Sequence, residues 1–522
     1  MLSPTKSSVS YYQLLAGLVV IGIGALSQSI WAIYPDPGKI DRFIWLMGCV
    51  SLYILLLSIK KIWEPSSSKY DLVCFLFSAS ICIASFWTLV FYPAIMPPDP
   101  VVQWGQALAG QYDTWHPPIM AMFMRFTQNF SGSPSLFTFC QGTLLWFSIF
   151  LLMRKLIRPN KLFLLSCCLV VFLPSLWAYT CYLVKDIWTA AMSVMGTAFI
   201  LYAIDARENQ QTKTSLIYLG SSIFCFAIAI AFRHNGITLV LPVFIVIIKY
   251  FRAHSFWKIL IALLLTLLIC ISPARLIERL PNVTMRTPTA LHLASMYLGT
   301  ISRANLTDAE MNKVRSEFDS VFGQGAFQAA FELFYPRNYC LMRYWAVPVK
   351  WENYSEVLSF SFQKMLSSAI SYPREFIEHR LCHLSLTFQI KQIDHPFYLH
   401  AGQGGIAYIM NNQLGLVEAS RFPVIMHKIY NILMDSLYPN NFISIIWRTW
   451  IWMLASTVIA TLALFRNQRD IVITNAVGMA YAFSFLLIDS FADWRFLFLT
   501  YICSLTAIVA FTASITIPLS KE

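Results

Sequence analysis

About a dozen apolar runs divide this chain, and each is about as long as a helix that crosses a membrane. The runs lie near residues 12–34, 43–59, 72–95, 136–153, 162–183, 187–204, 215–232, 236–251, 257–273, 441–465, 470–488 and 496–516. A membrane-spanning helix needs about 20 mostly apolar residues. The runs therefore predict an all-α polytopic membrane protein with about twelve transmembrane helices.

The low content of charged residues supports this prediction. Charged residues make up 12% of the 522 residues, whereas a soluble globular chain carries about 25%. This composition argues against a cytosolic multidomain enzyme, a disordered chain and a nucleic-acid-binding protein. Most of the twelve cysteines lie inside apolar runs at irregular spacing. That usage is typical of small buried apolar residues rather than of a disulfide framework.

Lysine and arginine are concentrated in alternate short loops, which the positive-inside rule places in the cytoplasm. These loops carry Lys60, Lys61, Lys69, Arg154, Lys155, Arg158, Lys161, Arg207, Lys213, Lys249, Arg252, Lys258, Arg466 and Arg469. Lys6 and Lys521 place both termini on the same side. We therefore expect a multi-pass protein of the inner (cytoplasmic) membrane with both termini cytoplasmic. Most of the net charge of +12 then sets orientation and does not bind a substrate.

The outer face receives one long segment, residues 275–440, which is polar enough to fold in water. We expect it to form a small helical outer (periplasmic) domain. It separates an N-terminal transmembrane module, residues 1–274, from C-terminal transmembrane helices in residues 441–522. The first outer loop of the N-terminal module covers residues 96–135. No internal repeat is visible, which weakens the hypothesis of a transporter built from inverted halves.

Two features predict helices within the long outer segment. Residues 307–310, Thr-Asp-Ala-Glu, have the spacing of a helix capping box. Residues 356–390 predict one or two amphipathic helices, with a break at Pro373.

The first outer loop carries two carboxylates, Asp99 and Asp113. Asp99 directly follows an apolar run and lies among prolines that fix the local backbone. The residues that follow, Val101 to Leu108, predict a short amphipathic helix in the membrane interface. Asp99 is then either the N-terminal cap of this helix or a residue held there for chemistry.

This loop resembles the first outer loop of the GT-C class of membrane glycosyltransferases, which includes protein O-mannosyltransferases and the aminoarabinose transferases of lipid A. The matching residues are Asp99, Gln106, Ala107, Gly110, Tyr112, His116, Pro117 and Pro118, followed by an amphipathic helix from Ile119 to Phe130. Recognisable residues cover about the first third of the chain, and the rest is similar only in topology. Asp99 is followed by Pro100, where family members often have a second acid.

The resemblance implies a GT-C-like fold and a sugar transfer at the outer membrane surface. The donor would be a sugar linked to a polyprenyl phosphate such as undecaprenyl phosphate, and the acceptor would be an outer glycan, lipid or protein. Because no acidic pair stands at Asp99, a metal bridged by adjacent acids is not implied. The resemblance assigns no definite cofactor, and a divalent cation is possible.

Sugar transfer from a lipid phosphate needs a base for the acceptor hydroxyl and cations for the leaving phosphate. Its transition state resembles an oxocarbenium ion, and one carboxylate suffices if the sugar configuration inverts. Asp99 suits the base by its position at the membrane surface. Asp113, nearer the middle of the loop, is the second candidate.

Two pairs of residues on the outer face offer cations. Lys185-Asp186 lies at the outer end of a span, either as a local pair that anchors the helix end or as a phosphate-binding lysine beside an orienting carboxylate. Arg233-His234 lies in a very short outer turn. Arginine suits forked binding of phosphate oxygens there, and an ordinary interfacial arginine is the alternative.

A third candidate cation is Arg495, at the outer start of the last span, with Asp489 and Asp493 nearby. It is similar to the arginine-aromatic motif of several GT-C families, in which the arginine contacts the carrier phosphate. A structural pair with Asp493 is the alternative.

The prediction for the whole site is that Asp99 faces Lys185, Arg233 and Arg495 across one cavity, with His116 also contacting substrate.

Other outer residues cannot be ranked from sequence: Arg337, Arg343, Lys350, His379, Arg380, His395 and His400. His379 and His383 have the spacing of metal ligands on a helix, but no set of acidic or cysteine partners accompanies them. A structural helix face is the better interpretation.

Two other functions remain open. A glycan polymerase or ligase using a lipid diphosphate donor would also need outer arginines, and residues 275–440 could be its large late loop. A transporter of lipid-linked sugars predicts charged residues near the middle of spans, and almost none are found. The sequence does not identify the sugar or the acceptor.

Overall fold

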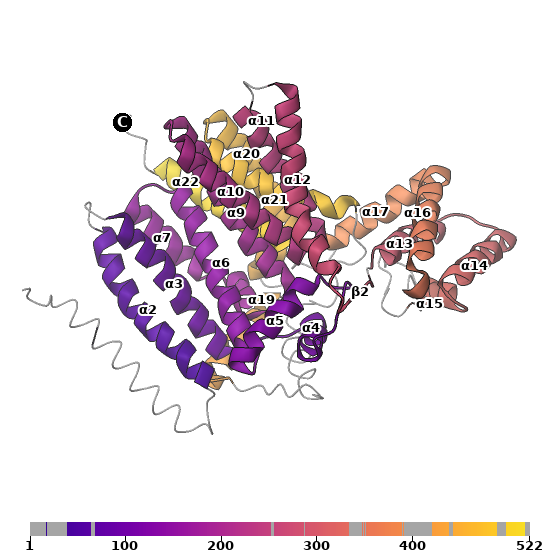
Figure 1. The fold of residues 1–522 in the computed structure, drawn as a ribbon, viewed down its shortest axis with the longest axis horizontal. Coiled ribbons are helices and arrows are strands. Elements are labelled where there is room, and N and C mark those ends of the chain that lie inside the picture. Colours follow the sequence, from indigo (N-terminus) through magenta and orange to yellow (C-terminus); the bar gives the residue numbers. More distant parts are fainter. Residues whose placement is uncertain are drawn as a thin grey trace, which may run out of the picture.

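The computed structural model describes residues 39–63, 68–251, 255–286, 288–332, 351–388, 420–437, 442–487 and 497–516, together with Gly17, Val347, Val349 and Ile390. A bundle of long helices forms most of this structure, and a smaller helical lobe projects from one side of it (Figure 1). The two strands in the described part of the chain are two residues long each. The predicted all-α fold is confirmed.

Within the described residues, seven helices are long and apolar enough to cross a membrane. They are α2 (Lys39–Trp63), α3 (Lys69–Val90), α6 (Ser135–Leu156), α9 (Lys185–Glu208), α10 (Thr212–Phe232), α12 (Phe256–Glu278) and α22 (Phe498–Thr516). An eighth candidate span is broken: α7 (Asn160–Val171) and α8 (Pro174–Cys181) meet at a bend of 70°. Pro174 begins α8, in keeping with the preference of proline for the first turn of a helix.

The bundle contains further helices that pack beside these spans. They are η1 (His234–Leu239), α11 (Val240–Phe251), α19 (Pro423–Leu437), η5 (Phe442–Trp447), α20 (Thr449–Phe465) and α21 (Arg469–Leu487). The apolar run predicted at 12–34 lies outside the described residues, apart from Gly17. The polytopic membrane character is confirmed by the apolar helices, and the total of twelve spans stays a prediction.

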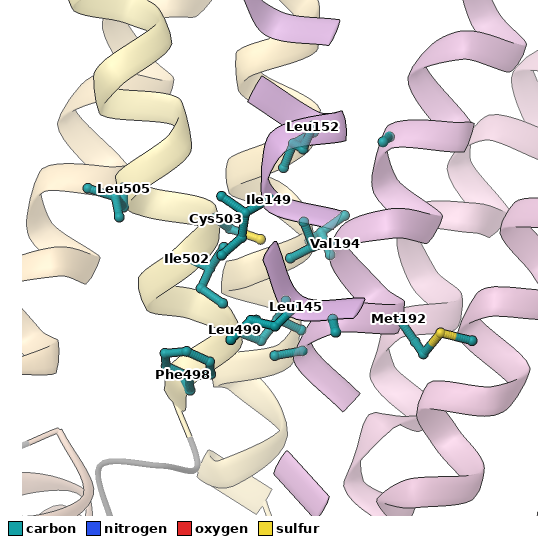
Figure 2. Packing of buried hydrophobic residues seen from close by; sticks show 14 of the residues in the cluster. Leu145, Ile149, Leu152, Met192, Val194, Phe498, Leu499, Ile502, Cys503 and Leu505 are labelled. Atoms are coloured by element: carbon teal, nitrogen blue, oxygen red, sulfur yellow. The ribbon is translucent and has the colours of Figure 1, made fainter. Parts of the chain in front are cut away.

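The centre of the bundle lies between α6, α9 and α22, where apolar side chains from the three helices interlock (Figure 2). The side chains shown there include Leu145, Ile149, Leu152, Val194, Leu499, Ile502 and Cys503. Small residues let neighbouring helices approach closely. The hydroxyl of Ser222 on α10, for example, donates a hydrogen bond to the carbonyl of Gly196 on α9 at 2.8 Å.

One end of the bundle, the basic end, gathers residues from the loops predicted to be cytoplasmic. Lys155 of α6 is buried there, 2.9 Å from the carboxylate of Asp205 on α9 and also paired with Asp470 on α21. Arg469 pairs with Asp205 at 3.3 Å and also with Glu208. These ion pairs join three helices at a single end.

At the opposite end lie α4 (Pro98–Ala109), β1 (Tyr112–Asp113), α5 (Pro118–Ser131) and β2 (Val283–Thr284). The helices α4 and α5 confirm the two short helices predicted in the first outer loop. β1 and β2 pair in parallel, with Tyr112 opposite Val283 and Asp113 opposite Thr284. This pairing ties the loop to the chain that leaves α12.

Both short helices are amphipathic, and each ends at a glycine with a left-handed backbone. Gly110 has a φ of 68° and Gly132 a φ of 65°, a conformation that glycine adopts without a steric penalty. On α4, Trp104 is buried and Val102 is exposed. On α5, Phe130 is exposed.

The lobe consists of α13 (Thr289–Ile301), α14 (Asp308–Phe322), α15 (Ala326–Glu332), η3 (Trp351–Asn353), α16 (Tyr354–Ser371) and α17 (Pro373–Thr387). It has its own apolar core, in which the rings of Phe318 and Phe322 stack at 4.2 Å. The predicted capping box is present, because the side chains of Thr307 and Glu310 each accept a hydrogen bond from the backbone N–H of the other residue. The predicted break at Pro373 separates α16 from α17.

Candidate functional site

Asp99 lies in the first turn of α4, where a carboxylate is favoured by the partial positive charge of the helix N-terminus. The N-cap position belongs to Pro97, which forms no side-chain capping hydrogen bond. The alternative that Asp99 is the helix cap is therefore wrong. Its carboxylate instead lies 3.7 Å from Nε2 of His116, and 35% of the Asp99 side chain is exposed.

His116 is held by a loop that β1 and β2 fasten in place. The amide of Thr114 donates to the carbonyl of Thr284 at 3.0 Å, and the Thr114 hydroxyl accepts from the amide of Arg286 at 2.7 Å. Two residues later, Nδ1 of His116 lies 3.0 Å from the ammonium of Lys185. The imidazole of His116 is therefore a bridge between Asp99 and Lys185.

The contacts of His116 define its tautomer when the ring is neutral. A lysine ammonium can only donate hydrogen bonds, so Nδ1 of His116 accepts from Lys185. The ring proton then resides on Nε2, which is the nitrogen that faces Asp99. Lys185, His116 and Asp99 thus form a row of contacts, which ends in a partly exposed carboxylate with the imidazole on one side.

Asp186 follows Lys185 in the first turn of α9 and forms a buried ion pair with Arg233. Arg233 is the C-cap residue of α10, so the end of α10 meets the start of the antiparallel neighbour α9 here. Exposed fractions are 2% for the Asp186 side chain and 8% for the Arg233 side chain. The guanidinium of Arg233 also lies over the ring of Phe485 on α21, 5.2 Å from the ring centroid.

The lobe adds two residues that face these cations. Arg380 of α17 is buried and donates to the backbone carbonyl of Phe485 at 3.2 Å. His292 of α13 is the second: burial, and then the charges of Lys185, Arg233 and Arg380, lower its pKa from the usual 6.5 to about 4. His292 is consequently neutral at pH 7.

These contacts bring together residues from the loop of residues 96–135 and from α9, α10, α13 and α17. We call them the charged cluster: Asp99, His116, Lys185, Asp186, Arg233, His292 and Arg380. Sequence analysis named six of them, and placed Arg380 only in an unranked group. It missed His292, because a lone histidine in an apolar helix carries no local signal of its contacts.

The structure describes only some of the other residues that were predicted for the site. Oδ1 of Asp113 accepts from the amide of Trp115 at 3.1 Å, which stabilises the turn after β1. The backbone of His234 begins η1, but its side chain lies outside the described part of the structure. Outside it too are Asp489, Asp493, Arg495, Arg337, Arg343, Lys350, His395 and His400.

The described residues contain no group of three or more His, Cys, Asp or Glu side chains that could hold a metal ion. His379 and His383 of α17 are both buried in the lobe. A methyl group added at Gly299 would lie 2.2 Å from Nε2 of His379, so this ring packs directly against the backbone of α13. This packing agrees with the interpretation of the two histidines as a structural helix face.

No family model, curated protein or solved structure matches the chain. The apolar helices define the class, which is an all-α polytopic membrane protein. Any more specific activity must be argued from the charged cluster itself.

Proposed function

We propose that the protein is a glycosyltransferase of the GT-C type, which moves a sugar from a polyprenyl-phosphate donor to an outer glycan, lipid or protein. The observation that carries the proposal is the Lys185–His116–Asp99 chain next to the Asp186–Arg233 pair. A partly exposed carboxylate and several cations, drawn from segments far apart in the sequence, lie together at one end of an apolar bundle. Sugar transfer from a lipid phosphate needs this combination.

Asp99 acts in this scheme as the general base that removes the proton of the acceptor hydroxyl. His116 lies beside one oxygen of the carboxylate, and the partial exposure of the Asp99 side chain would let an acceptor hydroxyl approach it. As the bond between the sugar and the phosphate breaks, Lys185 and Arg233 stabilise the charge on the departing phosphate. A divalent cation could assist that step, but none of these roles requires it.

The proposed orientation places the charged cluster on the outer face of the inner membrane and the basic end in the cytoplasm. Two features support it. The basic end contains Lys155 and Arg469, as the positive-inside rule expects of a cytoplasmic end. Cys382 of the lobe is disulfide-bonded, unlike the ten free cysteines of the bundle, and disulfides persist in oxidising compartments.

The proposal is tested by deleting the gene and comparing the envelope glycans and lipids of the host by mass spectrometry. The strain is complemented with wild type, Asp99→Asn or Asp113→Asn. We expect wild type and Asp113→Asn to restore the missing sugar, and Asp99→Asn to fail although it is made in normal amounts. Full restoration by Asp99→Asn would exclude Asp99 as the base. The same result would be expected of a ligase or polymerase that does not use this carboxylate.

A further inference from the structure

Exposed apolar side chains of the lobe are confined to two of its helices, α16 and α17. Within the part of the lobe that the structure describes, every exposed large apolar side chain belongs to one of them, and we call this set the lobe stripe: Phe362, Leu366, Ile370, Ile377 and Leu381. The exposed fractions range from 47% for Leu366 to 73% for Ile370. Single apolar residues scattered over a surface are ordinary, but a group gathered on one part of a domain indicates a surface that contacts an apolar partner.

The exposed residues of α16 lie along one side of the helix. Phe362, Leu366 and Ile370 follow one another at intervals of four residues, which places them on the same side of an α-helix. The opposite side points into the lobe, where Val357 and Ser361 are fully buried. The exposed residues are therefore not part of the lobe's own apolar core, and they face away from it.

The same division is found on α17. Ile377 and Leu381 are four residues apart and exposed, whereas His379 on the other side of the helix is buried. The apolar side has a polar border, because Arg374 and Glu378 form an exposed ion pair at 2.9 Å beside Ile377. Amphipathic helices that lie in a membrane interface combine an apolar side with such a polar border.

The end of α17 is attached to the bundle at the start of an apolar helix. The carbonyl of Phe388, the C-cap residue of α17, accepts a hydrogen bond from the amide of Trp450 at 3.0 Å. Trp450 belongs to the first turn of α20, and 36% of it is exposed. Tryptophans at the ends of apolar helices are typical of the membrane interface. We therefore expect α17 to leave the bundle at the level of this interface.

The lobe extends sideways from the bundle and does not continue the line of its spans (Figure 1). A body in this position lies over the lipid that surrounds the bundle. In this view the spans extend upward from the end that carries α4 and α5, and within the lobe α16 and α17 lie above α14 and α15 (Figure 1). The two helices that carry the lobe stripe are thus on the side of the lobe nearer to the spans.

We propose that the lobe rests on the lipid surface beside the bundle, with the lobe stripe among the headgroups and the upper part of the acyl chains. This contact removes from water the apolar side chains that the lobe exposes. It also holds α17 in place, and with it the contact of Arg380 with the carbonyl of Phe485. Such a contact requires only the lobe and the bilayer, whatever reaction the protein catalyses.

The test uses the full-length protein with the photoreactive residue p-benzoylphenylalanine in place of Phe362, Ile370 or Ile377. Each variant is reconstituted into proteoliposomes of phosphatidylethanolamine and phosphatidylglycerol, irradiated, and examined by mass spectrometry for attached phospholipid. The matched control carries the same residue in place of Ser316, which is exposed on α14, a helix with no exposed large apolar side chain. Burial of one large apolar side chain favours contact by more than about tenfold, so we expect at least about tenfold more phospholipid adduct at the lobe stripe than at Ser316.

Other patterns of attachment would overturn the proposal. Equal phospholipid adduct at the lobe stripe and at Ser316 would show that the lobe does not rest on the bilayer. Attachment to a second copy of the chain would make the lobe stripe a dimer interface, and attachment within the same chain would mean that the protein covers it. The replaced side chains are exposed, so each variant should fold, and its Tm is compared with that of wild type. If one variant does not fold, the remaining positions still decide the result.

Discussion

The buried pair of Asp186 and Arg233 allows the structural role of Arg233 to be separated from phosphate binding. Each single substitution removes a countercharge from a buried group, because the side chains are only 2% and 8% exposed. Breaking a buried ion pair in this way costs about 3–5 kcal/mol. Arg233→Gln also loses the contact with the Phe485 ring, worth about 0.5–2 kcal/mol. We therefore expect Arg233→Gln to destabilise the protein more than Asp186→Asn.

The assay is thermal unfolding of the purified protein in detergent, followed by tryptophan fluorescence. For 522 residues, an unfolding entropy of about 2 cal/mol/K per residue converts the loss from the broken pair into a decrease in Tm of roughly 3–5 °C. The double variant Asp186→Asn with Arg233→Gln replaces both charges with neutral amides. It should recover most of the stability lost with this ion pair, because neither member of the pair then stays charged and buried without the other.

Binding of undecaprenyl phosphate separates the two roles. If Arg233 contacts phosphate, the double variant regains its Tm but still binds the lipid about tenfold or more weakly. Recovery of both Tm and binding would show that Arg233 only pairs with Asp186. An unchanged Tm in both single variants would refute the reasoning from burial and charge.

Three further predictions concern other parts of the molecule. The pKa of His292 is about 4 in the folded protein and about 6.5 in an unfolded chain. Between these pH values the folded state binds fewer protons than the unfolded state. The free energy of unfolding therefore falls as the pH drops from 6.5 toward 4, by up to about 1.4 kcal/mol per pH unit. His292→Asn should flatten this dependence of Tm on pH, and identical profiles would contradict the assignment. Lys155→Met removes the buried cation between Asp205 and Asp470, which both keep Arg469 as a second partner, and should lower the stability by about 1.5–3 kcal/mol, measured as Tm against an exposed Lys161→Met control. Cys382 should react with a membrane-impermeant maleimide on intact cells only after reduction, and labelling without reductant would contradict the disulfide.

The features that sequence analysis predicted best are those determined by neighbouring residues. Thr307 and Glu310 form their capping box within one turn, so the spacing alone specifies it. Pro373 interrupts the helical pattern because it lacks an N–H, and the structure begins α17 there. The short helix predicted over Val101 to Leu108 is present as α4, which stops at the left-handed backbone of Gly110.

The composition of the charged cluster depends on contacts between distant segments, which one sequence does not reveal. Asp99 and Lys185 were chosen for their places at helix ends, and the structure joins them through His116. Nothing near Arg380 or His292 in the sequence distinguishes them from other basic residues of the lobe. Only the packing of α13 and α17 against the bundle brings these two side chains to the cations.

The pairing of β1 with β2 has a consequence for the order in which the protein assembles. The side-chain amide of Asn282 donates to the carbonyl of Gly110 at 3.0 Å across 172 residues, and the backbone of Tyr112 bonds to Asn282 as well. During synthesis the loop that carries His116 emerges long before its partner, so it has no fixed place until α12 has been inserted. Arg380 arrives about a hundred residues after that. Ribosome-bound chains that end before α12 should therefore already contain Asp99, His116 and Lys185 without holding them in their final arrangement.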